Sequence, residues 1–69
     1  MPEFSVGDKV THRQLPSLGV LEVTGLGREQ VWPDKGPVRK VYWKAIDPDN
    51  LAYQNGLKDW TWDFALEAW

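Results

Sequence analysis

Turn-forming residues divide this chain into short segments, and their spacing limits the possible folds more than any other feature. Glycine, proline, asparagine and aspartate recur about every 8–12 residues, which is typical of short strands rather than helices. The clearest strand is 38–46, where Val41, Trp43 and Ala45 alternate with polar or outward residues in the period-two pattern of a half-buried strand. The sequence therefore predicts an all-β protein.

The same pattern predicts where the strands lie. We expect strands at 9–13, 19–26, 38–46 and 57–62, and within 63–69 a helical turn that feeds a short fifth strand. Gly25 and Gly27 predict a bulge or bend where the second strand curls to close a barrel. The polar segment 28–37 is expected to be a loop, and 47–50 a turn followed by a loop that runs to Gly56.

The length and the residue types available bound the possible function. With 69 residues the chain is expected to form one domain, 1–69. It has no cysteine and one histidine, His12, so disulfides, thiolate metal sites and a zinc site made of several imidazoles are excluded. Without a recognisable nucleophile–base pair or metal cluster we expect a non-catalytic protein that uses no cofactor. His12 follows Val10 on one strand face and is interpreted as a packed, hydrogen-bonded core residue rather than a proton-transfer group.

The sequence also predicts where the protein resides. No segment approaches the ~20 apolar residues that span a bilayer, and the opening residues form neither a basic region nor an apolar run. We therefore expect a cytoplasmic protein with no membrane partner.

Several motifs follow one another in an informative order. The chain reads Phe4-Ser5-Val6-Gly7-Asp8-Lys9-Val10-Thr11-His12, then Gly19-Val20-Leu21-Glu22-Val23, later Val41-Tyr42-Trp43 and finally Ala65-Leu66-Glu67. This order resembles SH3/Tudor-like barrels, in particular the C-terminal Tudor-like domain of UvrD/PcrA-type helicases and the RNA-polymerase-interacting domain of CarD-type regulators.

The resemblance implies a single small SH3/Tudor-like barrel of about five strands. It also implies a bacterial or phage accessory protein that docks on a larger assembly, such as RNA polymerase or a helicase complex in transcription or DNA repair. The opening is also similar to plasmid-encoded type II dihydrofolate reductases, but the Val-Gln-Ile-Tyr segment that lines their active site is missing.

Aromatic residues are more numerous than a small core needs. The chain has five tryptophans, two tyrosines and two phenylalanines, each large ring buries about 150–250 Å², and a barrel of this size encloses only a few. The rings expected to bind a partner are Trp32, Tyr42, Tyr53 and Trp69. Trp60 and Trp62 should share a strand face, either as core or as an exposed platform. A further alternative is a homo-oligomer in which surplus tryptophans bury one another.

Basic residues beside these rings leave nucleic acid open as an alternative partner. Arg39, Lys40 and Lys44 flank Tyr42 and Trp43, and interleaved cations and rings can hold a single strand. The net charge of −2 argues against this reading, because phosphate neutralisation supplies most of the affinity of nucleic-acid modules. A protein-interaction module is therefore the first prediction and a nucleic-acid-binding barrel the alternative.

Overall fold

The computed structural model describes residues 4–69, so three residues of the expected 1–69 domain lie outside it. The described residues form five strands, one short helix and two 3₁₀ turns. In chain order these are β1 (Lys9–His12), η1 (Pro16–Leu18), β2 (Leu21–Trp32), β3 (Gly36–Ala45), α1 (Leu51–Gln54), β4 (Lys58–Trp62), η2 (Asp63–Ala65) and β5 (Leu66–Ala68).

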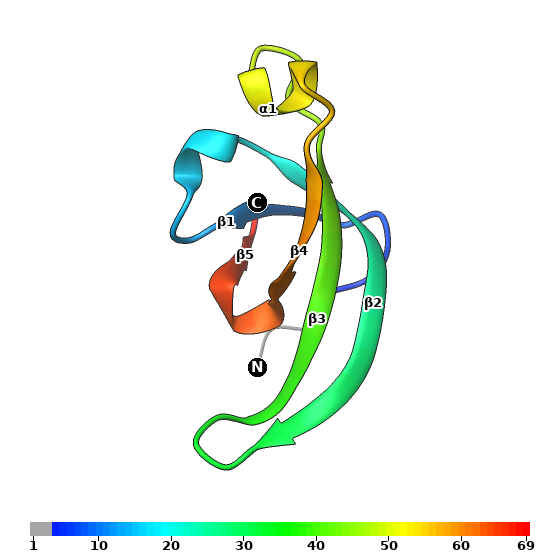
Figure 1. Ribbon diagram of the computed structural model, residues 1–69, viewed down its shortest axis with the longest axis vertical. Helices are drawn as coiled ribbons and strands as arrows, with labels where there is room; N and C mark the ends of the chain where they lie inside the picture. The colour runs from blue at the N-terminus through cyan, green and yellow to red at the C-terminus, as the bar shows by residue number, and fades with distance from the viewer. Residues whose placement is uncertain (1–3) are drawn as a thin grey trace.

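All strand pairs are antiparallel, and the strands form one sheet in the order β4-β3-β2-β1-β5. The sheet curls, so that β1, η2 and β5 lie on the concave side of the long β2–β3 hairpin (Figure 1). The expected small all-β, barrel-like fold of about five strands is confirmed, including the helical turn and short strand at the end of the chain.

The β2–β3 hairpin extends through most of the segment that was expected to be a loop, so the prediction is wrong for 28–32 and 36–37, and only 33–35 form a turn. Cross-strand pairing continues from Glu29↔Arg39 to Trp32↔Gly36. The polar residues Arg28, Glu29 and Gln30 are exposed on a paired strand, so the polar composition of the segment reflects its exposure rather than irregular structure. Gly36 has a φ of 75°, a conformation that glycine adopts without strain, and this closes the turn between the strands.

The bend predicted at the glycines of β2 is confirmed. The β2–β3 register shifts between Val23 and Gly25 and again between Leu26 and Glu29, and each shift gives β2 one residue more than β3. Such bulges increase the local twist of a sheet. They allow the long strand β2 to bend and to continue through both halves of the curled sheet.

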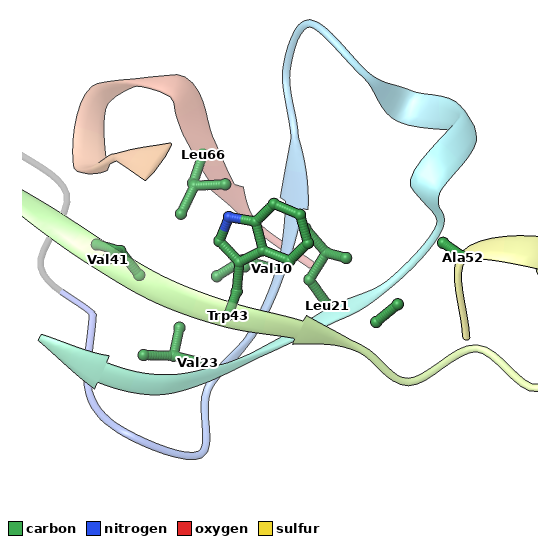
Figure 2. Close-up of a cluster of buried hydrophobic side chains, with 8 residues drawn as sticks. Val10, Leu21, Val23, Val41, Trp43, Ala52 and Leu66 are labelled. Carbon is green, nitrogen blue, oxygen red and sulfur yellow. The ribbon is translucent and has the colours of Figure 1, made fainter. Parts of the chain in front are cut away.

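The core lies between the two halves of the sheet. Val10, Leu21, Val23, Val41 and Trp43 are all buried, and they are joined by Ala45, Ala52 and Leu66. Figure 2 shows the Trp43 indole in the middle of this cluster, with Leu66, Val10 and Leu21 around it. The indole Nε1–H donates to Oγ1 of Thr61 at 3.0 Å, so the polar atom of this buried ring has a partner.

His12 takes the structural role that the sequence predicts. Its side chain is 8% exposed, and Nδ1 accepts hydrogen bonds from the amides of Gln14 at 3.1 Å and Leu15 at 3.2 Å. The imidazole therefore holds the turn that follows β1.

The segment after β3 is more ordered than the expected loop. Asp47 Oδ1 accepts from the amide of Asp49 at 3.1 Å. Asn50 Oδ1 caps α1 by accepting from the amide of Ala52 at 2.9 Å, and Asn50 Nδ2 donates to the carbonyl of Ser17 at 2.6 Å. These local side-chain bonds specify a turn and a helix cap.

Candidate interaction surface

The outer face of strands β3 and β4 carries aromatic and basic side chains in alternating rows. Tyr42 pairs with Trp60 across the strands, and Lys40 pairs with Trp62. Thr61, which lies between the two tryptophans, points inward to Trp43. Successive residues of a strand face opposite sides, so Trp60 and Trp62 share a face, as the sequence predicts. That face is the outer one, which decides between the two alternatives that the sequence left open.

Four rings of this surface contact one another edge to face. The ring centroids are 5.3 Å apart for Trp60 and Trp62, 4.8 Å for Trp32 and Trp62, and 5.7 Å for Trp32 and Phe64. Edge-to-face pairs at these distances are favourable beyond their burial. We call the surface formed by Trp32, Tyr42, Trp60, Trp62 and Phe64 the aromatic face.

The aromatic face lies outside the main core. None of its rings belongs to the buried cluster around Trp43, and Trp60 and Tyr42 are 39% and 41% exposed. Val38 is only 2% exposed but is also not part of that cluster. Phe64 lies in η2, which packs against β3, and its ring contacts Trp32, so this end of the face is a second, smaller apolar site.

Two lysines lie over the rings. Lys40 Nζ is 4.5 Å from the ring centroid of Trp60 and 5.9 Å from that of Trp62, and Lys35 Nζ is 4.4 Å from the centroid of Phe64. These are cation–π distances. The rings therefore hold two positive charges at defined positions on the face.

A basic row borders the rings toward α1. Lys44 pairs across the strands with Lys58 on one side and Glu22 on the other, and its Nζ is 3.5 Å from Oε1 of Glu22. Three lysines, Lys40, Lys44 and Lys58, thus share this face with one glutamate, while the whole chain has a net charge of −2.

Between Glu22 and Trp32, β2 carries two glycines beside the Tyr42 and Lys40 side chains. Gly25 pairs with Tyr42, and a Cβ at Gly27 would lie only 3.0 Å from Cβ of Lys40. The two glycines let the Tyr42 and Lys40 side chains lie close to the backbone of β2. They make this part of the surface flat.

The structure brings together only some of the residues that the sequence analysis proposed as partner-binding. Trp32, Tyr42, Lys40 and Lys44 belong to the outer face described above. Arg39 precedes Lys40 on β3, pairs with Glu29, and so points to the opposite side of the strand.

Tyr53 and Trp69 lie apart from the aromatic face. Tyr53 is in α1, at the opposite end of the molecule from the β2–β3 turn beside Trp32 (Figure 1). Trp69 follows β5, at the other end of the strand order from β4, where its amide donates to the carbonyl of Lys9 at 3.1 Å. Neither ring stacks on another within residues 4–69.

Sequence reasoning missed Phe64, Lys35 and Lys58 as members of this surface. The Trp60-x-Trp62 spacing was the available signal for this face, since alternate residues of a strand share a face. Phe64 follows in η2, which packs against β3, so strand alternation could not place it. Nothing in the sequence around Lys35 and Lys58 indicates that they belong to this surface, because their positions depend on which strands are neighbours.

The rest of the described chain offers weaker candidates. A shallow, open hollow near α1 is lined by residues including Ser17, Leu18, Asn50 and Leu57. Within residues 4–69, no three or more His, Cys, Asp or Glu side chains are grouped so that they could hold a metal ion. None of the helices in that part of the chain has the length and apolar character needed to cross a membrane.

Comparison with known proteins gives no match for this chain among family models, curated proteins or solved structures.

Proposed function

We propose that this protein is a non-catalytic interaction module that docks on another protein through the aromatic face. The observation on which this rests is a set of neighbouring rings outside the core, of which Tyr42 and Trp60 are exposed. Exposed apolar patches on small soluble domains are typical of interaction sites. Tryptophan and tyrosine are also the residues most enriched among those that dominate binding energy.

The arrangement of the face favours a defined partner. Each of the three tryptophans of the aromatic face contacts another ring, so the surface is preorganised and its side chains lose little conformational freedom on binding. Residues 4–24 resemble the barrels that dock on RNA polymerase. We therefore propose that the protein is a cytoplasmic module of a transcription or DNA-repair assembly.

Direct binding of nucleic acid is the second candidate, favoured by Lys40, Lys44 and Lys58 beside Tyr42 and Trp60. Three features weigh against it: the chain has a net charge of −2, Lys44 lies beside Glu22, and Arg39 faces the other way. A single strand stacking on Trp60 would also have to displace Lys40 from that ring or use its other side.

An affinity pull-down from nuclease-treated lysate of the source cells tests the proposal. The bait is the full chain, compared with a Tyr42→Ala/Trp60→Ala variant that removes the two exposed rings of the face. Tyr53→Ala is the matched control, because Tyr53 is an exposed ring away from that face.

We expect one protein or complex to be retained at low and at moderate salt by the parent and by Tyr53→Ala, and lost by the double variant. Retention that occurs only in a parallel lysate without nuclease supports nucleic-acid binding instead. So does retention that is lost as the salt concentration rises, because phosphate contacts are strongly salt-dependent. Capture that the double variant leaves unchanged contradicts the proposal.

A further inference from the structure

The lysines of the aromatic face indicate the chemistry of the partner. Lys40, Lys44 and Lys58 lie on the outer side of β3 and β4, with Glu22 as the acidic residue in their cross-strand rows. The face is therefore positive on a protein whose net charge is negative. Docking surfaces are arranged so that their potentials are complementary to those of the partner.

The spacing along β3 is regular. Lys40, Tyr42 and Lys44 are alternate residues of one strand, so they lie on one face about 6.8 Å apart. An extended partner segment presents its residues i, i+2 and i+4 at the same interval. A segment lying along β3 therefore meets a cation, a ring and a second cation in register with three of its own side chains.

The cations differ in how firmly they are held. The Lys40 ammonium lies over Trp60 and Trp62, which fixes its position while its N–H groups can still donate to an oxygen acceptor. Lys44 is beside Glu22, and Lys58 opposes Lys44 across the strands. Like charges that oppose each other in a sheet destabilise it, so an acidic group bound between Lys44 and Lys58 relieves this repulsion.

We propose that the segment recognised by the aromatic face is acidic and extended, with the pattern acidic-x-apolar-x-acidic. The acidic side chains pair with Lys40 at one end and with Lys44 and Lys58 at the other, and the apolar side chain packs on Tyr42 and Trp60. This inference rests on the proposed function and adds to it the chemistry of the partner.

Selection from a displayed library of random peptides tests this pattern. Peptides of about 10 residues are long enough to cross the face, since a strand rises ~3.3 Å per residue. Selection is carried out on the parent chain and on a Lys44→Glu/Lys58→Glu variant, which reverses two charges without removing a ring contact. The control is Arg13→Glu/Arg39→Glu, which makes the same change of charge away from the face, because Arg13 follows β1 and Arg39 points to the opposite side of β3.

We expect the parent and the control to enrich peptides with Asp or Glu on both sides of an apolar residue. The charge-reversed variant should instead enrich Lys or Arg at the position facing residues 44 and 58. Circular dichroism and tryptophan fluorescence establish that all three chains are folded.

Three results overturn the inference: enriched peptides that lack acidic residues, the same consensus on the charge-reversed variant, or no enrichment. An oligothymidine of about ten nucleotides provides the test for nucleic acid. If it binds the parent but not the charge-reversed variant, and no peptide is enriched, the face is assigned to nucleic acid. The proposed function has a separate readout, because lysate capture that depends on Tyr42 and Trp60 still stands if the partner segment proves not to be acidic.

Discussion

The ammonium nitrogen of Lys40 lies 4.5 Å from the ring centroid of Trp60, its diagonal neighbour on the adjacent strand. The same nitrogen is 5.9 Å from the centroid of Trp62, directly opposite Lys40 in the ladder. Lys40 therefore contacts both tryptophans that β4 contributes to the aromatic face.

Lys40→Met should destabilise the protein modestly, by about 0.5–1 kcal/mol, which is the usual size of a cation–π contact near the surface. Methionine keeps most of the aliphatic stem and removes the charge. The measurement is urea unfolding followed by tryptophan fluorescence. Lys40→Arg should retain most of the stability, because a guanidinium also binds ring faces. Equal losses in the two variants would assign the effect to packing rather than to charge.

Gly27→Ala and Gly25→Ala form a matched pair with opposite expectations. A Cβ at Gly27 would be 3.0 Å from Cβ of Lys40, which sits on a paired strand and cannot swing away, whereas at Gly25 the nearest atom is Tyr42 Cδ2 at 3.7 Å. We expect Gly27→Ala to cost about 1–3 kcal/mol, the range for overpacking. Gly25→Ala should be neutral or stabilising by up to ~1 kcal/mol, because glycine weakens a strand interior. Chemical denaturation of both variants measures the difference, and a reversed order would contradict the packing described at β2.

Thr61→Val should destabilise the core although valine has nearly the same shape. The substitution leaves Nε1–H of the buried Trp43 without its acceptor, and an unpaired buried donor costs about 1–3 kcal/mol. Thr24→Val is the control, since Thr24 is exposed on β2. If urea midpoints fall equally in both variants, the Trp43–Thr61 hydrogen bond does not stabilise the fold.

Leu66→Ala should unfold much of the population. Leu66 is fully buried and belongs to the three-residue strand β5, and truncating such a leucine costs about 2–5 kcal/mol. That is close to the whole stability expected of a domain this small. Leu51→Ala serves as the control because Leu51 is 71% exposed. Circular dichroism during heating should show a large drop in midpoint for the first variant and little change for the second.

Asp59→Ala should promote self-association through the β4 edge. β4 is an end strand of the sheet, and the Asp59 carboxylate accepts a hydrogen bond from the amide of Trp60 at 2.8 Å. Removing it leaves a free amide on an edge strand, a common starting point for pairing between chains. Asp59→Asn keeps an oxygen acceptor and isolates the effect of charge. Sedimentation velocity should show larger species for Asp59→Ala, and an unchanged monomer peak would show that Asp59 does not protect this edge.

Much of the fold could be predicted because short-range rules agree with the final structure. Alternation along β3 identified Val41 and Trp43 as inward and Tyr42 as outward, and the barrel core later contained both inward residues. The glycines of β2 marked its bulges. The error at 28–37 arose because polar composition was taken as a sign of irregular structure, whereas strand pairing can order a segment that is exposed on its surface.

The candidate surface was only partly predictable for a related reason. The sequence by itself determined that the chain forms short strands, that Trp60 and Trp62 share a side, and that there are more rings than the core can hold. Only the tertiary structure decided which rings meet. The pairing of β4 with β3 brings Trp60 to Tyr42 and Lys40 to Trp62, and the long hairpin carries Trp32 to Phe64. Alternation of side chains is a property of a single strand, whereas the choice of neighbouring strand depends on how the whole sheet curls around its core. The same curvature keeps Tyr53 and Trp69 away from the aromatic face.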